Sequence, residues 1–259
     1  MKSKRIDEME EYIHINKKVS LSELEDKFQV SMNTIRRDIK VLLEKDVITK
    51  VYGGVESKKD IYLNKDDVLI DIETRNTINK EEKVSIAKEA ARYINNGDTI
   101  YIDSGTTTSA ILNYLDRDIS LTIVTNSVSV LNKAIKFPNV EIIISGNAYR
   151  KRTNSFVKIG NYSILDRVNV VKAFMAATSV SVANGAMNAT LEEYELKSKI
   201  ITKAREKYLL VDSTKFNKTG FITFAVLTDF KMIITDKLVD GDFKKFLALK
   251  NIDLIETKN

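Results

Sequence analysis

The segment Asp103-Ser104-Gly105-Thr106-Thr107-Thr108 combines residue types that can bind a phosphate group. It follows an apolar run that is typical of a buried strand, and we expect a helix after it, over residues 110–115. Gly105 allows close approach to the backbone, threonine hydroxyls can donate hydrogen bonds, and the free N–H groups at a helix start attract anions. A capped strand-to-helix turn without a ligand is the alternative interpretation.

A second motif with possible chemistry is the pair Asp212 and Lys215, which follows another apolar run. An aspartate can accept hydrogen bonds from sugar hydroxyls, and a lysine can attract a phosphate. The alternative is a local surface ion pair, which would contribute little to stability. The basic run over residues 150–152 is more typical of a solvated loop than of a binding site.

Both motifs belong to a series of apolar runs that alternate with helical stretches and end in small polar residues. This pattern predicts a parallel sheet covered by helices on both faces. Ligands bind such sheets at the carboxyl ends of the strands, so the polar ends predict a pocket for a hydroxylated, anionic molecule. The runs are residues 99–102, 121–124, 140–144, 172–176, 208–211 and 231–234, and before them we expect a helix that Asn79 caps and that places Val84, Ala87, Ala91 and Ile94 on one side.

The first 56 residues predict a different architecture, with three short helices. Apolar residues recur at helical spacing, Ser20 to Glu23 forms a capping box, and Gln29-Val30 predicts a tight turn before a helix over residues 32–45 that Ser31 can cap. The outward side chains of this third helix are hydrogen-bond donors, with Asp38 as the exception. They are Asn33, Thr34, Arg36, Arg37 and Lys40.

Such a surface suits the major groove of DNA, because arginine can pair with guanine, asparagine with adenine, and threonine and lysine with phosphates. Residues 47–52 alternate like a strand, and the turn at Gly53-Gly54 before Val55 predicts a β-hairpin. A winged helix-turn-helix is therefore expected. A three-helix packing cap with a basic surface helix is the alternative.

The composition excludes several other classes of protein. Without cysteine there is no disulfide framework or thiolate chemistry, and one histidine, His14, excludes a histidine-based metal cluster. We interpret His14 as a packing residue and expect neither a metal nor a cofactor. No apolar run approaches the roughly 20 residues that span a bilayer. The N-terminus turns acidic before a signal peptide could form, which favours a cytoplasmic location without membrane contact.

The net charge of +5 does not by itself indicate nucleic-acid binding. Residues 1–56 hold eleven basic and eleven acidic residues, so the surplus lies in residues 57–259. Only the local placement of donors on the third helix supports DNA binding.

The stretch Val30-Ser31-Met32-Asn33-Thr34-Ile35-Arg36-Arg37-Asp38-Ile39, followed by Val51-Tyr52-Gly53-Gly54-Val55, resembles the signature of the DeoR family of bacterial operon repressors. The second half matches the sensor half of that family through Glu73-x-Arg75, Glu82-Lys83, Gly97-Asp98, D-x-G-T-T, Thr125-Asn126 and D-x-x-K, in family order. The resemblance implies an α/β sensor domain of the sugar-phosphate isomerase type. It also implies that Arg75, Lys83, Asp212 and Lys215 respond to the effector.

Pattern and resemblance together give two sets of expected site residues. The expected DNA-binding residues are Ser31, Asn33, Thr34, Arg36, Arg37, Lys40, Tyr52, Gly53 and Gly54. The expected effector-binding residues are Arg75, Lys83, Asp103, Ser104, Gly105, Thr106, Thr107, Asn126, Gly146, Asp212 and Lys215.

One position departs from the family pattern. Many members have a Gly-Gly pair after the third strand of the sensor, whereas Gly146 is followed here by Asn147, which puts a side chain at the expected pocket rim. Within the family the chain is most similar to repressors of myo-inositol catabolism, through Met9-Glu10-Glu11-Tyr12-Ile13, residues 51–55 and residues 103–108. The inducer of those repressors is a phosphorylated keto-sugar acid.

These observations predict a winged helix-turn-helix over residues 1–56, a linker over 57–78 and an α/β effector-binding domain over 79–259. The expected function is repression of a carbohydrate catabolic operon, relieved by a phosphorylated sugar. A homo-oligomer, dimer or tetramer, is expected because one helix reads few base pairs and paired half-sites add affinity. An activator would use the same two sites. A sugar-phosphate isomerase-type enzyme is the rival from another class, although the second domain has no histidine.

Overall fold

The computed structural model describes residues 5–257, except 7, 11, 14–17, 46, 58–71, 152, 159–163 and 239. Two compact units divide the chain, Met1–Leu69 and Ile70–Asn259. His14, Arg152 and most of the predicted linker lie outside the described residues. No helix in the described ranges is long and apolar enough to cross a membrane.

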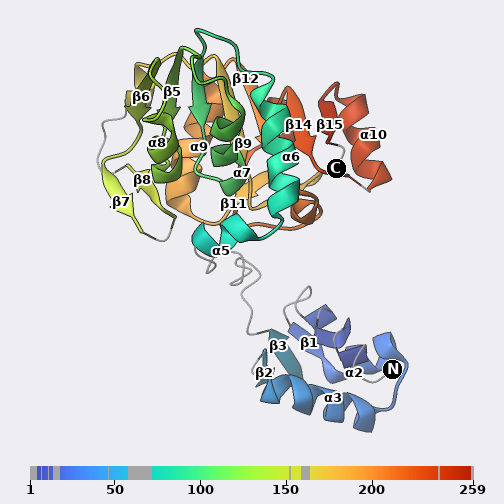
Figure 1. Ribbon diagram of the computed structural model, residues 1–259. Helices are drawn as coiled ribbons and strands as arrows, with labels where there is room; N and C mark the ends of the chain where they lie inside the picture. The colour runs from blue at the N-terminus through green and yellow to red at the C-terminus, as the bar shows by residue number, and fades with distance from the viewer. Residues whose placement is uncertain are drawn as a thin grey trace. The chain divides into compact units, whose positions relative to one another are not determined.

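The first unit is a winged helix-turn-helix, as the sequence predicts (Figure 1). Helix α2 (Leu21–Phe28) and helix α3 (Met32–Glu44) follow a helical stretch within residues 5–13. Strands β2 (Ile48–Val51) and β3 (Gly54–Ser57) form the predicted hairpin. Strand β1 (Lys18–Ser20), which was not predicted, pairs with β3 and gives the sheet order β1-β3-β2.

The core of this unit comes from the apolar stripes of the helices and from the inward side chains of the sheet. Leu24 of α2, Ile35 and Leu42 of α3, and Val19 and Val55 of the sheet are almost completely buried. Because the apolar positions of α3 are three or four residues apart, one side of that helix is fixed against the core and the other faces solvent.

The second unit is built on a seven-stranded parallel sheet (Figure 1). Its order is β15-β14-β12-β9-β4-β5-β6. The strands are β4 (Thr99–Ile102), β5 (Leu121–Thr125), β6 (Val140–Ile144), β9 (Lys172–Ala176), β12 (Glu206–Leu210), β14 (Met232–Thr235) and β15 (Asp253–Glu256). Six of these strands coincide with the predicted runs to within two residues, whereas β15 was not predicted.

Alternate residues of each strand pack on opposite faces of this sheet, as the pleat requires. In β4, Ile100 and Ile102 join the core under helices α6 (Lys80–Ala91) and α8 (Val128–Ala134). Tyr101 between them joins the other core, under α9 (Leu191–Lys203) and α10 (Gly241–Leu249). The sheet is therefore covered on both faces, which confirms the predicted class.

The helix α6 differs from its prediction in two details. Its buried stripe consists of Ile86, Ala87, Ala90 and Ala91, and Val84 lies at the edge of that stripe, where it is exposed. Asn79 occupies the N-cap position with a φ of 49°, but its side chain makes no capping hydrogen bond.

Two small antiparallel sheets complete the second unit, and neither was predicted. One contains β10 (Ser179–Ser181), β11 (Gly185–Asn188) and β13 (Ile222–Ala225), and the other pairs β7 (Ala148–Arg150) with β8 (Ser155–Val157). The remaining elements are α5 (Ile72–Thr77), α7 (Thr106–Ser109) and the 3-10 helices η1 (Ala110–Tyr114), η2 (Ile164–Asp166), η3 (Ser213–Lys215) and η4 (Leu227–Asp229).

Candidate DNA-binding surface and effector site

The turn between α2 and α3 is set by local interactions. The Ser20 hydroxyl accepts a hydrogen bond from the Glu23 N–H and caps α2, as expected. Gln29 ends that helix in the left-handed conformation, with a φ of 52°. Ser31 occupies the N-cap position of α3, but its hydroxyl pairs with the Thr34 hydroxyl at 3.1 Å rather than with a backbone N–H.

The outward face of α3 carries the predicted donors with one correction. Asn33, Arg36, Arg37 and Lys40 are exposed, and Thr34 is half-buried. The prediction that Asp38 belongs to this face is wrong, because Asp38 is completely buried. Its position lies three residues after Ile35 and four before Leu42, within the inward stripe.

A buried carboxylate needs a partner, and Arg5 of the first helical stretch supplies it. The Arg5 Nε donates to Asp38 Oδ2 at 2.8 Å, and this hydrogen bond raises the pKa of the guanidinium. The ion pair joins the first helical stretch to α3 and removes the negative charge of Asp38 from the outward face. The donor surface is thus more uniformly positive than the sequence indicated.

The hairpin lies beside α3 and encloses a groove of about 460 Å³ with it. Arg36 and Lys40 of α3 line this groove together with Lys50 of β2. Tyr52 is fully exposed at the tip of the hairpin. Gly53 has a φ of 80°, and a Cβ on Gly54 would lie 2.1 Å from the Val19 carbonyl oxygen, so the turn and the pairing with β1 both need glycine.

In the second unit, Lys83 of α6 is a buried cation near the carboxyl end of β12. Its Nζ donates to the carbonyl oxygens of Arg75 and Ile78 at 2.5 and 2.7 Å. Burial lowers the pKa of Lys83, the charge of Asp212 opposes this shift, and the positive charges of Lys215 and Arg75 add to it. The structure therefore brings together Arg75, Lys83, Asp212 and Lys215, which we call the effector cluster.

Asp212 is the buried acceptor of the effector cluster. Its Oδ1 accepts hydrogen bonds from Asn79 Nδ2 and from the Thr214 N–H, each at 3.1 Å, and from the Thr214 hydroxyl. The carboxylate caps η3 and is only 2% exposed. Arg75 Nε is buried and has no hydrogen-bond partner among the described residues.

Asp103 begins the loop Asp103–Thr107, which we call the effector loop. Its Oδ2 accepts from the Ala176 N–H at 3.0 Å and forms an ion pair with Lys197 Nζ at 2.8 Å. Both side chains are more than nine-tenths buried. Lys197 also donates to the Ala176 carbonyl at 2.7 Å, so it ties α9 to the ends of β4 and β9. Nothing in the sequence pattern pointed to Lys197, because it is one of three lysines in the second half of α9.

The helix after the effector loop starts earlier than predicted. Helix α7 begins at Thr106 and continues as η1, so Thr106 and Thr107 belong to its first turn. The Thr108 hydroxyl donates to the carbonyl oxygens of Asp103 and Gly105, which holds the loop in shape. A Cβ on Gly105 would lie 2.4 Å from the Ala176 Cβ, so packing against β9 alone requires this glycine.

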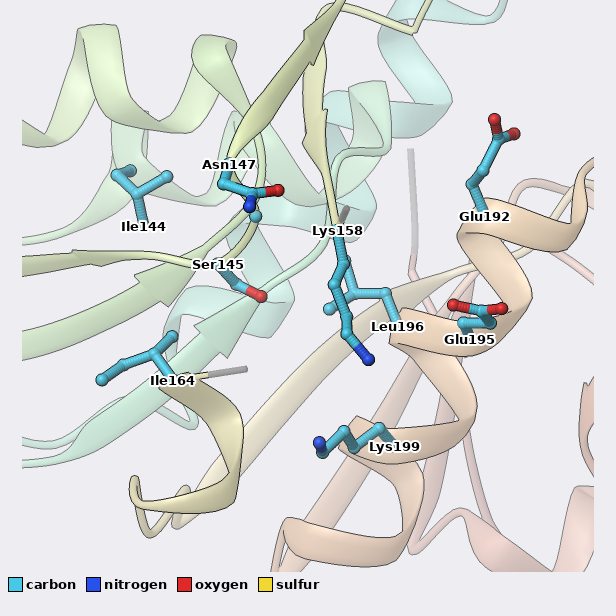
Figure 2. A pocket seen from close by; sticks show the side chains of 10 residues that line it. Ile144, Ser145, Asn147, Lys158, Ile164, Glu192, Glu195, Leu196 and Lys199 are labelled. Carbon is cyan, nitrogen blue, oxygen red and sulfur yellow. The ribbon is translucent and has the colours of Figure 1, made fainter. Parts of the chain in front are cut away.

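Two further expected effector residues follow β5 and β6. The Asn126 side chain accepts from the Tyr101 hydroxyl at 3.0 Å and donates to the Phe156 carbonyl at 3.2 Å, so it serves the packing between β5 and β8. Gly146 follows β6, two strands from β4, and lines a separate cavity with Asn147 and α9 (Figure 2).

Comparisons with known proteins match the two parts of the chain to two separate domain models. Residues 5–60 match the model of the DeoR-like helix-turn-helix domain, and residues 78–237 match that of the DeoR C terminal sensor domain. The HTH-type transcriptional regulator IolR of Bacillus subtilis is 43% identical over 246 residues, which cover 95% of this chain and 96% of that protein. A lactose phosphotransferase system repressor of Staphylococcus epidermidis is 31% identical, over 90% of this chain and 91% of the repressor.

Among solved structures, ribose 5-phosphate isomerase A of Methanocaldococcus jannaschii is similar to part of the chain. The match has a TM-score of 0.40 and 18% identity, and it covers 53% of this chain and 55% of the isomerase.

Proposed function

Because the chain belongs to the DeoR family of transcriptional regulators, we propose that it is a repressor that binds its operator through α3 and the hairpin and leaves it when a phosphorylated sugar binds to the second unit. The effector cluster and the effector loop together form the proposed sugar-phosphate site. Double-stranded operator DNA and one small molecule are the proposed partners.

The effector cluster carries the proposal for the ligand class. It gathers Arg75, Lys83 and Lys215, and its buried carboxylate, Asp212, accepts hydrogen bonds from Asn79 and Thr214. A phosphate could accept charge-assisted hydrogen bonds from these cations. The Ser104, Thr106 and Thr107 hydroxyls are the further donors that we assign to it.

The outward face of α3 supports the DNA half of the proposal. Its exposed arginines and Asn33 can reach base edges, and Lys40 and Lys50 can contact phosphates. One recognition helix covers few base pairs, so we propose that the repressor acts as a homo-oligomer on paired half-sites.

Release from DNA requires that the effector bind the low-affinity conformation more tightly than the DNA-bound conformation. A ligand with equal affinity for both would leave operator binding unchanged. On the similarity to IolR, we propose that the regulated genes serve carbohydrate catabolism, with myo-inositol as the first candidate pathway.

Binding without turnover is the proposed chemistry of the second unit. An isomerase needs a general acid and base next to the substrate. The carboxylate of the effector loop, Asp103, is instead held in an ion pair by Lys197. Turnover of a sugar phosphate that Asp103→Asn abolishes would contradict this assignment.

The experiment that tests the proposal is a thermal-stability screen of the full chain. Phosphorylated sugars and sugar acids are compared with their unphosphorylated parents, and a ligand at about 100 times its Kd should add roughly 2.7 kcal/mol to the free energy of unfolding. We expect one phosphorylated compound to stabilise the protein, Lys215→Met to abolish the shift, and Lys88→Met, an exposed lysine of α6, to preserve it. A broad panel without a stabilising phosphorylated compound would contradict the ligand class.

A further inference from the structure

The cavity beside α9 is separate from the effector cluster and has no role in the proposed release. It has a volume of about 160 Å³, far more than the roughly 10 to 15 Å³ that one water needs. Ile144, Ser145 and Asn147 at the end of β6 line one side, and Leu196 and Lys199 of α9 line the other. We call it the α9 cavity.

Polar donors converge in the α9 cavity. Figure 2 shows that the ammonium groups of Lys158 and Lys199 extend into the same space, which the Ser145 hydroxyl also faces. Ser145 is only 2% exposed, so its position is fixed by packing. Glu192 and Glu195 of α9 also line the cavity, and Glu192 pairs with Arg150 at 3.8 Å.

A carboxylate of the protein already responds to the positive charge of this region. Asp166 of η2 pairs with Lys199 at 2.5 Å. That hydrogen bond lowers the pKa of Asp166, and the charges of Lys199, Lys203 and Lys158 lower it further. Three ammonium groups therefore act on one carboxylate near the cavity.

The α9 cavity is distant from the effector cluster along the sheet. The ends of β12 and β6 are four strand spacings apart, roughly 19 Å. Between the ends of β4 and β6 lies Asn126, whose side chain is bonded to Tyr101 and to the Phe156 carbonyl. A ligand held by Asp212 and Lys215 is therefore separated from one beside Ser145.

We propose that the α9 cavity is a second ligand site, which binds a small molecule through a phosphate or carboxylate group held by Lys158, Lys199 and the Ser145 hydroxyl. Asn147, which replaces the second glycine of the family pattern, adds an amide at the rim. A matching ligand is anionic at the end that enters the cavity.

The position of α9 gives this site a route to the effector loop. Residues 192, 195, 196 and 199 share one face of the helix and line the cavity. Lys197 points to the opposite side and holds Asp103 and the Ala176 carbonyl. A ligand in the cavity therefore contacts the same helix that fixes the start of the effector loop.

The test follows the methyl NMR signals of the full-length protein during titration with inorganic phosphate and, separately, with acetate. Ile144, Ile164 and Leu196 line the cavity and report on it, whereas Ile78, whose carbonyl accepts from Lys83, reports on the effector cluster. Phosphate or acetate should move the three cavity signals, and Lys158→Gln should weaken this response about tenfold, as expected for a lost charged hydrogen bond.

The variants separate this site from the proposed sugar-phosphate site. Lys215→Gln should remove the response of Ile78 and leave the cavity signals unchanged, and Lys88→Gln should alter neither. Lys158 is exposed, so its variant should fold, which the other methyl signals verify. Cavity signals that stay fixed at saturating concentrations of both anions, that move equally with glycerol, or that ignore Lys158→Gln would overturn the proposal. None of these results depends on whether Ile78 responds.

Discussion

The two units of the protein place their functional groups in opposite ways. The donors of α3 are neighbours in the sequence, project from one helix into solvent and depend little on each other. The groups of the second unit come from α5, α6, β4, β12 and α9, and most of them are buried and bonded to one another. Changes on α3 should therefore alter binding alone, whereas changes in the second unit should alter stability as well.

The largest expected effect is loss of the buried ion pair at the effector loop. Asp103→Ala leaves Lys197 buried without its carboxylate and should lower the free energy of unfolding by about 3 to 5 kcal/mol. The matched control is Asp242→Ala, which removes an exposed pair with Lys245 and should cost less than about 1 kcal/mol. Chemical denaturation measures both. Equal losses in the two variants would contradict the claim that burial makes the Asp103 pair important for stability.

Next in size is the effect of Arg37→Ala on operator binding. We expect a loss of about 1 to 3 kcal/mol and relaxed base specificity if Arg37 reads a base edge. The free energy of unfolding should change by less than about 0.5 kcal/mol, because Arg37 is exposed. Fluorescence anisotropy with labelled operator measures the binding, with Lys18→Ala as a control. A destabilised variant would contradict the independence of the α3 donors.

The pH dependence of stability should distinguish Lys83, which is buried, from the exposed lysines. Burial lowers the pKa of Lys83 below 10.5, so the unfolded chain binds more protons between the folded pKa and 10.5. Stability should therefore rise with pH in this alkaline window, while affinity for a phosphorylated ligand falls as Lys83 loses its charge. Denaturation and calorimetry across the window measure both trends, and Lys83→Met should remove them. Identical pH profiles in the two proteins would exclude Lys83 as the titrating group.

The smallest expected effect is that of Tyr52→Ala at the tip of the hairpin. The side chain is fully exposed, so stability should be unchanged. Operator affinity should fall by less than about 1 kcal/mol, because an exposed tip makes peripheral contacts. Anisotropy at two salt concentrations separates this loss from a change in phosphate contacts, which alone would alter the salt slope. A loss of affinity larger than that of Arg37→Ala would show that the hairpin contributes more to operator binding than this residue of α3.

The same contrast explains how much of the structure could be predicted from the sequence. Periodicity located α2, α3, the hairpin and six parallel strands, because each of these elements has a local apolar pattern. It misplaced Asp38, since a polar residue inside an apolar stripe can be buried when a distant arginine pairs with it. Strand β15 was not predicted because it begins and ends with acidic residues, which interrupt the apolar pattern.

The site of the second unit could be predicted only as a set of strand ends. The parallel order does bring Asp103 and Asp212 to one edge of the sheet, and the effector cluster forms beside them. The contact between Lys197 and Asp103 joins residues 94 positions apart, and no local pattern encodes it. Gly146 was grouped with the other strand ends because the sequence does not give the strand order, in which β6 is four strands from β12.

Operator binding should be measured in the presence of the phosphorylated compound that stabilises the protein. We expect this compound to release the unaltered protein from the operator, and we expect Lys215→Met to bind the operator equally well but not to be released. Arg37→Ala should still be stabilised by the compound although it binds DNA poorly. Release of Lys215→Met at the same concentration, or stable operator binding of the unaltered protein with its effector cluster saturated, would contradict the account.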